Sequence, residues 1–239
     1  MSDQIKAWWS TLPICTKYIF ACTFGCTLAS AFGLASPLYL VLIPERIFYN
    51  YEIYRIVTCF FLYFLGFPFL MDMVFLINYG VQLEQNNFSN TADYVYFLLT
   101  GSLVLLLGGL VLDINLLGPG LIRMIIYVWA RKNPDIPMTF MFGLRFQSFW
   151  LPWVMMAFNM LMGGSPYSDL LGIVVGHLYY FLTVIYPNTS GKRLLQTPEV
   201  FYTWFPQGYR PPIAGRAAQQ AQAAPGGRVW GPGQALGGR

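Results

Sequence analysis

Residues 94–112 read YVYFLLTGSLVLLLGGLVL, a run without a single charged side chain. The hydrocarbon core of a bilayer is about 30 Å thick, and a helix needs roughly 20 apolar residues to cross it. Backbone groups in lipid must pair within their own segment, and this run does not alternate polar and apolar residues as the strands of a membrane barrel do. The stretch therefore predicts a transmembrane helix and an all-α fold.

The composition of the whole chain agrees with this prediction. Of 239 residues, 56% are hydrophobic and only 10% are charged, whereas soluble domains carry about 25% charged residues. With 14 basic and 10 acidic side chains, a soluble monomer could not cover its own surface. The same composition excludes disordered and nucleic-acid-binding proteins, and four cysteines are too few for a secreted disulfide scaffold. The sequence predicts a polytopic membrane protein.

Six apolar runs predict six transmembrane helices. They are Tyr18–Ala35, Pro68–Leu83, Tyr94–Leu112, Leu116–Ala130, Phe149–Met162 and Leu170–Tyr186. The second run belongs to a longer apolar stretch, Ile56–Val81, that Gly66-Phe67-Pro68 interrupts, since proline removes a backbone donor and bends a helix. Ile56–Leu65, before this break, is interpreted as an interfacial or re-entrant segment.

Two further segments flank the membrane domain, which we place at residues 18–187. Residues 1–17 form an amphipathic N-terminal segment, in which Trp8 and Trp9 beside Lys6 and Lys17 suit the headgroup level. Residues 188–239 are rich in proline and glycine toward their end and predict a flexible tail.

The distribution of basic residues predicts the orientation. If both termini are cytosolic, eleven Lys and Arg side chains lie on the cytosolic side and only Arg46 and Arg55 lie on the other, with Arg123 inside the fourth run. The positive-inside rule favours this orientation. The sequons at Asn87 and Asn188 then face the cytosol, and we expect neither to carry a glycan.

The sequence contains few residues for catalysis or metal binding. His177 is the single histidine, which excludes zinc sites built from several histidines. Cys22 and Cys26 are interpreted as packing residues. The run Leu116–Ala130 contains no serine, and no Gly-x-Ser-Gly string occurs anywhere. We therefore expect no catalytic serine, no metal and no cofactor.

Several polar side chains lie within the apolar runs and are functional candidates by default. They are Asp72, Asn78, Arg123, Asn159, Asp169 and His177. Each also has a structural interpretation, and Asp72 with Arg123 is compatible with a buried ion pair. Gly172 and Gly176 in the sixth run, four residues apart, would let two helix backbones approach closely.

The tail contains the string WGPGQAL at residues 230–236, an aromatic-Gly-x-Gly-x-x-aliphatic pattern. Two hydrophobic anchors joined by flexible glycines are typical of linear docking motifs. The alternative is a chance pattern in glycine-rich sequence.

Short strings spread over nearly the whole chain resemble the derlins, rhomboid-like pseudoproteases of the endoplasmic reticulum. Besides the N-terminal tryptophan segment they are LASPLYL (34–40), YVWA (127–130), FGLRF (142–146), LPWV (151–154), GHLY (176–179) and LQTP (195–198). The resemblance implies a six-helix rhomboid fold with a luminal loop between the first two spans. The family's Trp-Arg pair in that loop is Tyr54-Arg55 here, which we expect to anchor the loop.

The resemblance also implies a function without proteolysis. His177 follows the small-residue motif Gly172/Gly176, whereas a catalytic rhomboid histidine precedes it. The implied activity is retrotranslocation in endoplasmic-reticulum-associated degradation, with misfolded proteins as clients. The implied partners are a membrane ubiquitin ligase complex with its substrate receptors, other derlin copies in a homo- or hetero-oligomer, and the AAA ATPase valosin-containing protein, which would bind Trp230, Gly231, Gly233 and Leu236.

A physical hypothesis connects this activity with the sequence. A short second span would thin the bilayer locally, and Asp72 and Asn78 would admit water beside a lateral opening at that helix. Two other functions remain open from the residues alone: an active intramembrane serine protease, and a small-solute channel or transporter.

Overall fold

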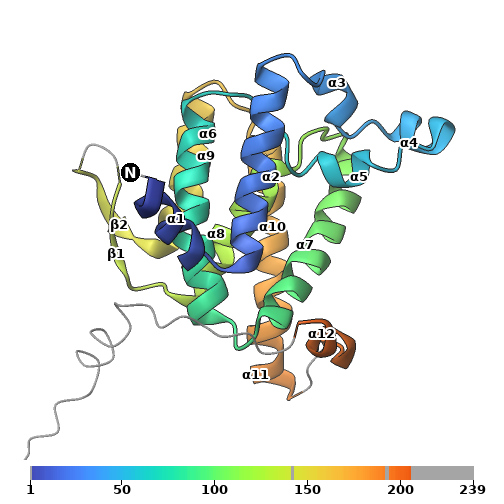
Figure 1. Cartoon of the computed structure of the whole chain (residues 1–239). Helices are drawn as coiled ribbons and strands as arrows, with labels where there is room; N and C mark the ends of the chain where they lie inside the picture. The colour runs from blue at the N-terminus through green and yellow to red at the C-terminus, as the bar shows by residue number, and fades with distance from the viewer. Residues whose placement is uncertain (1, 141–142, 192–193, 206–239) are drawn as a thin grey trace, which may run out of the picture. The chain divides into compact units, whose positions relative to one another are not determined.

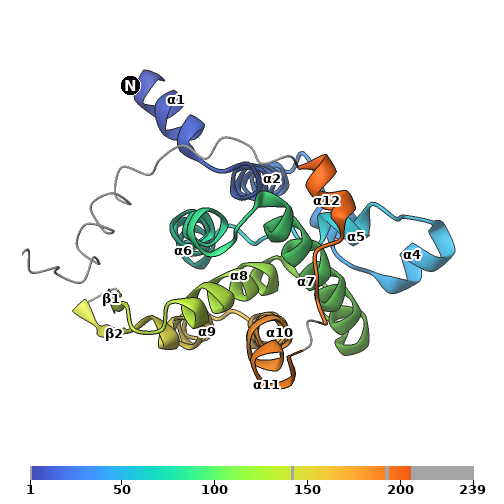
Figure 2. The same cartoon turned by 90° about the horizontal axis from the view of Figure 1, so that it is seen from below.

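Helix α8 (Gly118–Lys132) lies at the centre of the fold, and the other long helices surround it (Figures 1 and 2). The computed structural model of the chain describes residues 2–140, 143–191 and 194–205. Every residue of α8 from Gly120 to Ala130 is buried. A helix enclosed on all sides needs apolar residues on all sides, and Arg123 is the only charged side chain in this buried stretch.

The surrounding helices carry the other apolar runs. They are α2 (Ile14–Ala31), α6 (Phe67–Phe75), α7 (Thr91–Leu112), α9 (Leu151–Leu161) and α10 (Pro166–Tyr180). Each of the six predicted segments overlaps one of these helices or α8. Three helical stretches, Ile14–Ala31, Thr91–Leu112 and Pro166–Ser190, are long and apolar enough to cross a membrane. The prediction of a mostly helical membrane protein is therefore confirmed.

The second helix is longer than the predicted span Pro68–Leu83. α6 continues through two π-helical turns, η1 (Leu76–Gly80) and η2 (Leu83–Asn87). Pro68 lies in the first turn of α6, where a missing N–H leaves no hydrogen bond unmade. The Gly-Phe-Pro string thus marks the beginning of the second helix, where the predicted span also begins, and the difference from the prediction lies at the C-terminal end.

The segment between α2 and α6 forms a side arm of short helices (Figure 1). They are α3 (Pro37–Leu40), α4 (Pro44–Asn50) and α5 (Arg55–Thr58). α4 ends at Asn50, and the next residue, Tyr51, reverses the chain in the left-handed conformation with a φ of 56°. The predicted interfacial segment Ile56–Leu65 is helical only at its start, in α5.

The remaining elements are short. α1 (Ser2–Thr11) lies within the predicted amphipathic segment, and α11 (Tyr186–Ser190) extends α10 through the π-helical turn η5 (Phe181–Ile185). Between α8 and α9, β1 (Pro137–Thr139) pairs antiparallel with β2 (Arg145–Gln147), with Met138 opposite Phe146, and the 3₁₀ turn η4 (Ser148–Trp150) follows. α12 (Glu199–Trp204) packs beside α7. The predicted docking motif at residues 230–236 lies outside the described residues.

Candidate functional site

A buried charge cluster lies at the centre of the bundle, built around Arg123 of α8. Its Nη1 donates a hydrogen bond to Asp72 Oδ1 of α6 at 2.7 Å, and its Nε lies 3.1 Å from Asp169 Oδ1 of α10. Asn159 Nδ2 of α9 donates to the other oxygen of Asp169 at 2.7 Å. Four helices thus each contribute one polar side chain to a single cluster.

The cluster contains two carboxylates for one guanidinium. The Asp72, Arg123 and Asp169 side chains are no more than 6% exposed. Removing charges from water costs several kcal/mol per ion, and close opposite charges with additional hydrogen bonds offset that cost. The sequence suggested the Asp72–Arg123 pair and named Asn159 and Asp169 separately, and the structure brings all four together. If both carboxylates are ionised, the cluster keeps one net negative charge.

The other two predicted polar residues lie apart from the cluster. Asn78 in η1 is exposed. His177 on α10 is exposed too, and its Nδ1 lies 2.8 Å from the hydroxyl of Tyr127. Arg131 Nε donates to the same hydroxyl at 2.9 Å, and its guanidinium lies over the Tyr127 ring. The sequence did not indicate this second polar group, because Tyr127 sits within an apolar string.

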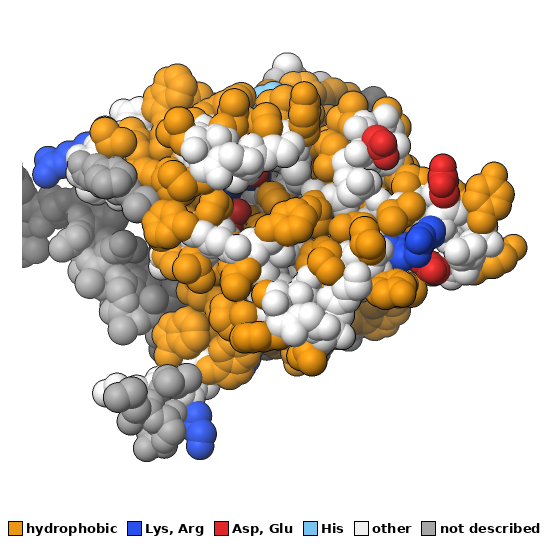
Figure 3. Space-filling view, turned by 90° about the horizontal axis from the view of Figure 1, so that it is seen from above, with side chains coloured by type: hydrophobic (Ala, Val, Ile, Leu, Met, Phe, Trp, Pro, Cys, Tyr) orange, Lys and Arg blue, Asp and Glu red, His pale blue; other side chains and the backbone are white. Residues whose placement is uncertain are grey.

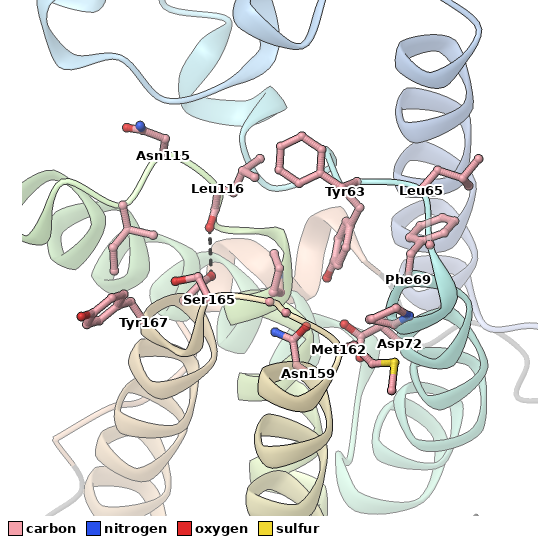
Figure 4. A pocket seen from close by; sticks show the side chains of 18 of the residues that line it. Tyr63, Leu65, Phe69, Asp72, Asn115, Leu116, Asn159, Met162, Ser165 and Tyr167 are labelled. Atoms are coloured by element: carbon pink, nitrogen blue, oxygen red, sulfur yellow. Dashed lines mark hydrogen bonds between the residues drawn. The ribbon is translucent and has the colours of Figure 1, made fainter.

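A cavity of about 790 Å³ opens above the charge cluster, at the end of the bundle where three connecting loops meet. Figure 3 shows acidic atoms at the bottom of a hollow that hydrophobic side chains surround. Asp72 and Asn159 line it, so the cluster forms its floor (Figure 4). The wall residues come from 63–69, 112–116 with Pro119, and 162–168.

Tyr63 and Ser168 are two cavity residues that the sequence did not indicate. The Tyr63 side chain is buried, and its hydroxyl makes no hydrogen bond with any described residue. The Ser168 hydroxyl is bonded to the backbone: it donates to Leu116 O at 2.9 Å and accepts the Gly120 N–H at 3.1 Å. His177 follows Ser168 by nine positions on α10, about 13 Å along a helix axis. These two residues therefore cannot form a serine–histidine dyad in this arrangement.

The glycines of α10 lie against α8. A Cβ atom added to Gly172 would lie 2.8 Å from Gly120 Cα, and one added to Gly176 would lie 3.1 Å from Tyr127 Cβ. Small residues at a helix contact let backbones approach closely. This close contact fixes the relative positions of Arg123 and Asp169, because they lie on α8 and α10.

Arg55 holds the side arm together. Its side chain is fully buried and its Nη1 donates to Leu38 O at 2.6 Å and to Val41 O at 3.0 Å, while Nε pairs with Glu52. Tyr54 is half-exposed, and its ring centroid lies 5.7 Å from the Arg55 guanidinium carbon. The guanidinium therefore connects the polypeptide on both sides of α4.

Glu84 forms a helix cap that the sequence analysis missed. Its carboxylate accepts hydrogen bonds from the Cys15 N–H at 3.1 Å, the Thr16 N–H at 2.9 Å and the Thr16 hydroxyl at 2.8 Å. The first N–H groups of a helix have no partner within the helix, and negative charge is favourable there. The available signal was an acidic residue placed directly after the apolar run Pro68–Leu83.

The end of α8 away from the cavity carries a partly buried lysine. Lys132 Nζ donates to Asn87 O at 3.0 Å and lies 4.0 Å from the centroid of the Phe88 ring. Burial lowers the pKa of the Lys132 ammonium to about 8, although Asp93 counteracts part of this effect. The contact ties α8 to the turn that follows η2.

Comparisons with known proteins agree with the resemblance. A model of the Der1-like family matches residues 12–199. Derlin-1 of Homo sapiens is 39% identical over 251 residues, which cover 99% of each chain. Derlin-2 of Oryza sativa subsp. japonica is 39% identical over 240 residues, covering 91% of this chain and 94% of its own. With its long apolar helices, this chain is therefore a multi-pass membrane protein that belongs to the Der1-like family, the derlins.

Proposed function

We propose that the protein is a non-proteolytic retrotranslocation factor of the endoplasmic reticulum membrane, with six spans and both termini in the cytosol. In this function it passes misfolded luminal and membrane proteins to the cytosol for degradation, in complex with a membrane ubiquitin ligase. Membership of the derlins supports the proposal. The observation that carries it is the open cavity with a charged floor inside an apolar bundle, because a polar polypeptide needs polar partners within the membrane.

A lateral opening between α6 and α9 would give clients access to the cavity. The contacts across this boundary are aromatic: the rings of Phe67 and Phe158 have centroids 5.8 Å apart, and Phe140 stacks on Phe75 and meets Phe158 edge-on, each at 5.8 Å. Ring contacts can slide and re-form, whereas the glycine contact of α8 with α10 cannot. Opening would therefore move α6 and α9 apart and leave α8 and α10 in place.

A short crosslink across this boundary tests the opening. Cysteines at Phe67 and Phe158, in a background without the native cysteines, should stop client clearance when joined by a short bis-maleimide and restore it when a cleavable linker is cut. The matched control is Gly25→Cys on α2, where an added Cβ atom has nothing within 4 Å. It is labelled with a maleimide that has a single reactive group, which modifies an exposed position without bridging helices. Normal clearance with the crosslink intact would argue against a lateral opening here.

Local thinning of the bilayer is part of the proposal, and α9 supports it better than the second helix does. The apolar helix Ser148–Leu161 is about 21 Å long at 1.5 Å per residue, which is less than the roughly 30 Å of a bilayer core. A helix shorter than the bilayer is accommodated by thinning. The second helix extends from Phe67 to Asn87 and does not have this deficit.

The tail would recruit valosin-containing protein through Trp230, Gly231, Gly233 and Leu236. Trp230→Ala or Leu236→Ala, like deletion of the last ten residues, should abolish capture of the ATPase and slow clearance of a misfolded luminal client. Gln234→Ala is the matched control within the same string and should leave both unchanged. Clearance at the normal rate without ATPase capture would contradict this part of the proposal.

The orientation can be tested through the two sequons. Neither Asn87 nor Asn188 should carry a glycan, whereas a sequon engineered into the side arm at Tyr49–Tyr51 should be modified. A glycan on either native sequon would reverse the proposed topology.

The two alternative functions predict different results. A fluorophosphonate probe would label an active serine protease and should not label this protein, in which Ser168 is bonded to the backbone. A solute channel would retain its flux after deletion of residues 230–239, and it would not require the ATPase.

A further inference from the structure

We infer that the floor of the cavity binds the primary ammonium group of a lysine side chain, presented by an extended client polypeptide. The inference rests on the proposed function, because it names the chemical class of the client segment that would enter the cavity. Three observations carry it: the charge of the cluster, a free hydrogen-bonding group above it, and the apolar walls.

The charge of the floor favours a cationic guest. Two carboxylates, Asp72 and Asp169, face a single guanidinium, that of Arg123. Among the described residues, Asp72 makes its one hydrogen bond through Oδ1, so Oδ2 keeps its acceptor capacity. Asp72 also lines the cavity. A cation placed there would neutralise the excess carboxylate charge. It would not desolvate Arg123 further, because the Arg123 side chain is already buried.

A second, independent observation points to a ligand at the same place. Tyr63 is only 7% exposed, and its hydroxyl has no hydrogen-bond partner in the described part of the chain. Figure 4 shows this side chain directed down into the cavity, toward the floor where Asp72 and Asn159 lie. Leaving a buried hydroxyl without a hydrogen-bond partner destabilises the folded protein. A guest that donates hydrogen bonds, as an ammonium does, would remove this cost.

The walls suit the rest of a lysine residue. A volume of about 790 Å³ falls within the range of small-ligand pockets and admits more than one side chain. Phe64, Phe69 and Tyr167 line the walls above the floor. Aromatic rings pack against the methylene stem of a lysine and attract its ammonium group.

Binding of short peptides to the full-length protein tests the inference. The protein is placed in nanodiscs of pure phosphatidylcholine, which contain no primary amine. Fluorescent decapeptides that differ only at one central position, lysine or norleucine, are titrated by fluorescence polarisation. We expect the lysine peptide to bind about tenfold more tightly, the value of one hydrogen bond to a charged group. Equal affinities would overturn the inference.

Two pairs of variants locate the site. Tyr63→Phe should reduce the lysine preference at least threefold, whereas Tyr49→Phe, which removes a hydroxyl from an exposed residue of the side arm outside the cavity lining, should not. Asp72→Asn should abolish the preference, whereas Asp135→Asn, at an exposed position outside the cavity lining, should keep it. If Asp72→Asn does not fold, the Tyr63 pair decides, and an unchanged preference in Tyr63→Phe would overturn the inference.

A lipid headgroup is the other source of a primary ammonium. Phosphatidylethanolamine retained by wild type and lost by Tyr63→Phe, with equal affinity for the two peptides, would assign the site to lipid and overturn the assignment to polypeptide. The outcome is also separable from the proposed function. If the protein prefers the lysine peptide but clears no client, the binding site is supported and the proposed function is refuted. If it clears clients normally but shows no lysine preference, the proposed function is supported and the binding site is refuted.

Discussion

Gly172 of α10 lies directly against Gly120 of α8, so that a Cβ atom at position 172 would stand 2.8 Å from Gly120 Cα and closer still to its carbonyl oxygen. Backbone atoms cannot rotate away as the end of a side chain can. The Gly172–Gly120 contact is therefore the least tolerant point of the α8–α10 interface.

The first prediction concerns this contact. Gly172→Ala should destabilise the protein by about 1–3 kcal/mol, the usual cost of overpacking, and thermal unfolding in detergent should show a lower Tm. Gly176→Ala should cost less, because the nearest atoms, Tyr127 Cβ and Cδ1, lie 3.1 Å away and need shift only slightly. Gly25→Ala is the control, with nothing within 4 Å of the added atom. Equal Tm values for Gly172→Ala and Gly25→Ala would contradict the prediction.

A larger residue at the second glycine should affect function as well as stability. Gly176→Val adds two methyl groups beyond the Cβ position that already touches Tyr127. We expect impaired removal of a misfolded luminal client at expression levels matched to wild type. Normal clearance by this variant would show that the proposed activity does not depend on the α8–α10 contact.

The charge cluster should respond unequally to single and combined neutralisation. Arg123→Met leaves Asp72 and Asp169 buried without a counter-charge, and breaking a buried ion pair in this way costs about 3–5 kcal/mol. The triple variant Asp72→Asn, Arg123→Met, Asp169→Asn removes all three charges and should recover a large part of that loss. Folded yield and chemical unfolding in detergent measure the stability of the single and the triple variant. A triple variant no more stable than Arg123→Met would refute the explanation that unpaired buried carboxylates cause the loss.

The cap of α2 gives a further prediction. Glu84→Ala leaves the Cys15 and Thr16 N–H groups without their acceptor, at about 1–3 kcal/mol for unsatisfied buried donors. Glu84→Gln retains one acceptor and should lose less. Hydrogen exchange at the beginning of α2 should accelerate in the order wild type, Gln, Ala. Gln82→Ala, at an exposed position just before η2, is the control and should not change it.

The side arm should depend on the shape of the Arg55 side chain. A lysine at this position cannot donate simultaneously to Leu38 O, Val41 O and Glu52 with the fixed fork of a guanidinium. Arg55→Lys should therefore make residues 32–54 sensitive to limited proteolysis while the bundle stays folded. Arg46→Lys, at an exposed position of α4, should leave the cleavage pattern of wild type, and identical patterns for both variants would exclude the anchoring role.

The contact of α12 with α7 should depend on pH. Asp93 Oδ1 accepts hydrogen bonds from the Tyr202 hydroxyl at 2.6 Å and from the Thr197 hydroxyl at 2.7 Å. The bond to Asp93 raises the pKa of the Tyr202 phenol above its ordinary value. Because the pKa is higher in the folded state, the contact stabilises α12 fully below about pH 10 and is lost as pH rises through the folded-state pKa.

The difference in phenolate absorbance between wild type and Tyr202→Phe reports this titration. Its midpoint should lie above that of an ordinary tyrosine, and Asp93→Asn should move it back. A midpoint that is the same with and without Asp93 would show that the hydrogen bond does not hold α12.

Residue patterns predicted the parts of this structure that the bilayer dictates. The predicted run Tyr94–Leu112 is a helix that also ends at Leu112, because this run is long enough to cross a bilayer and contains no charged residue. The beginning of the second span was predicted at Pro68, one residue from the first residue of α6, and proline is tolerated in the first turn of a helix. The end of this span was placed too early, at Leu83, because the polar residues 84–87 end the apolar run although they continue the same helix.

The cavity could not be predicted in the same way. Tyr63 precedes α6, Asn159 lies on α9 and Ser168 lies on α10, and only the packing of the bundle brings them together. Their spacing along the chain carries no signal for such convergence. Arg123 could be identified as unusual from one run alone, but its second carboxylate, Asp169, is 46 positions away.

The position of Arg123 also constrains how the chain is assembled during synthesis. An arginine at the middle of a membrane helix costs about 2.5–3.5 kcal/mol on the insertion scale. Asp72 precedes α8 in the chain and can meet it as it inserts, whereas Asp169 and Gly172 arrive only with α10. A nascent chain that stops before α10 would hold half of its counter-charge and leave Gly120 uncovered. The last long helix would therefore complete both the charge cluster and the packing of α8.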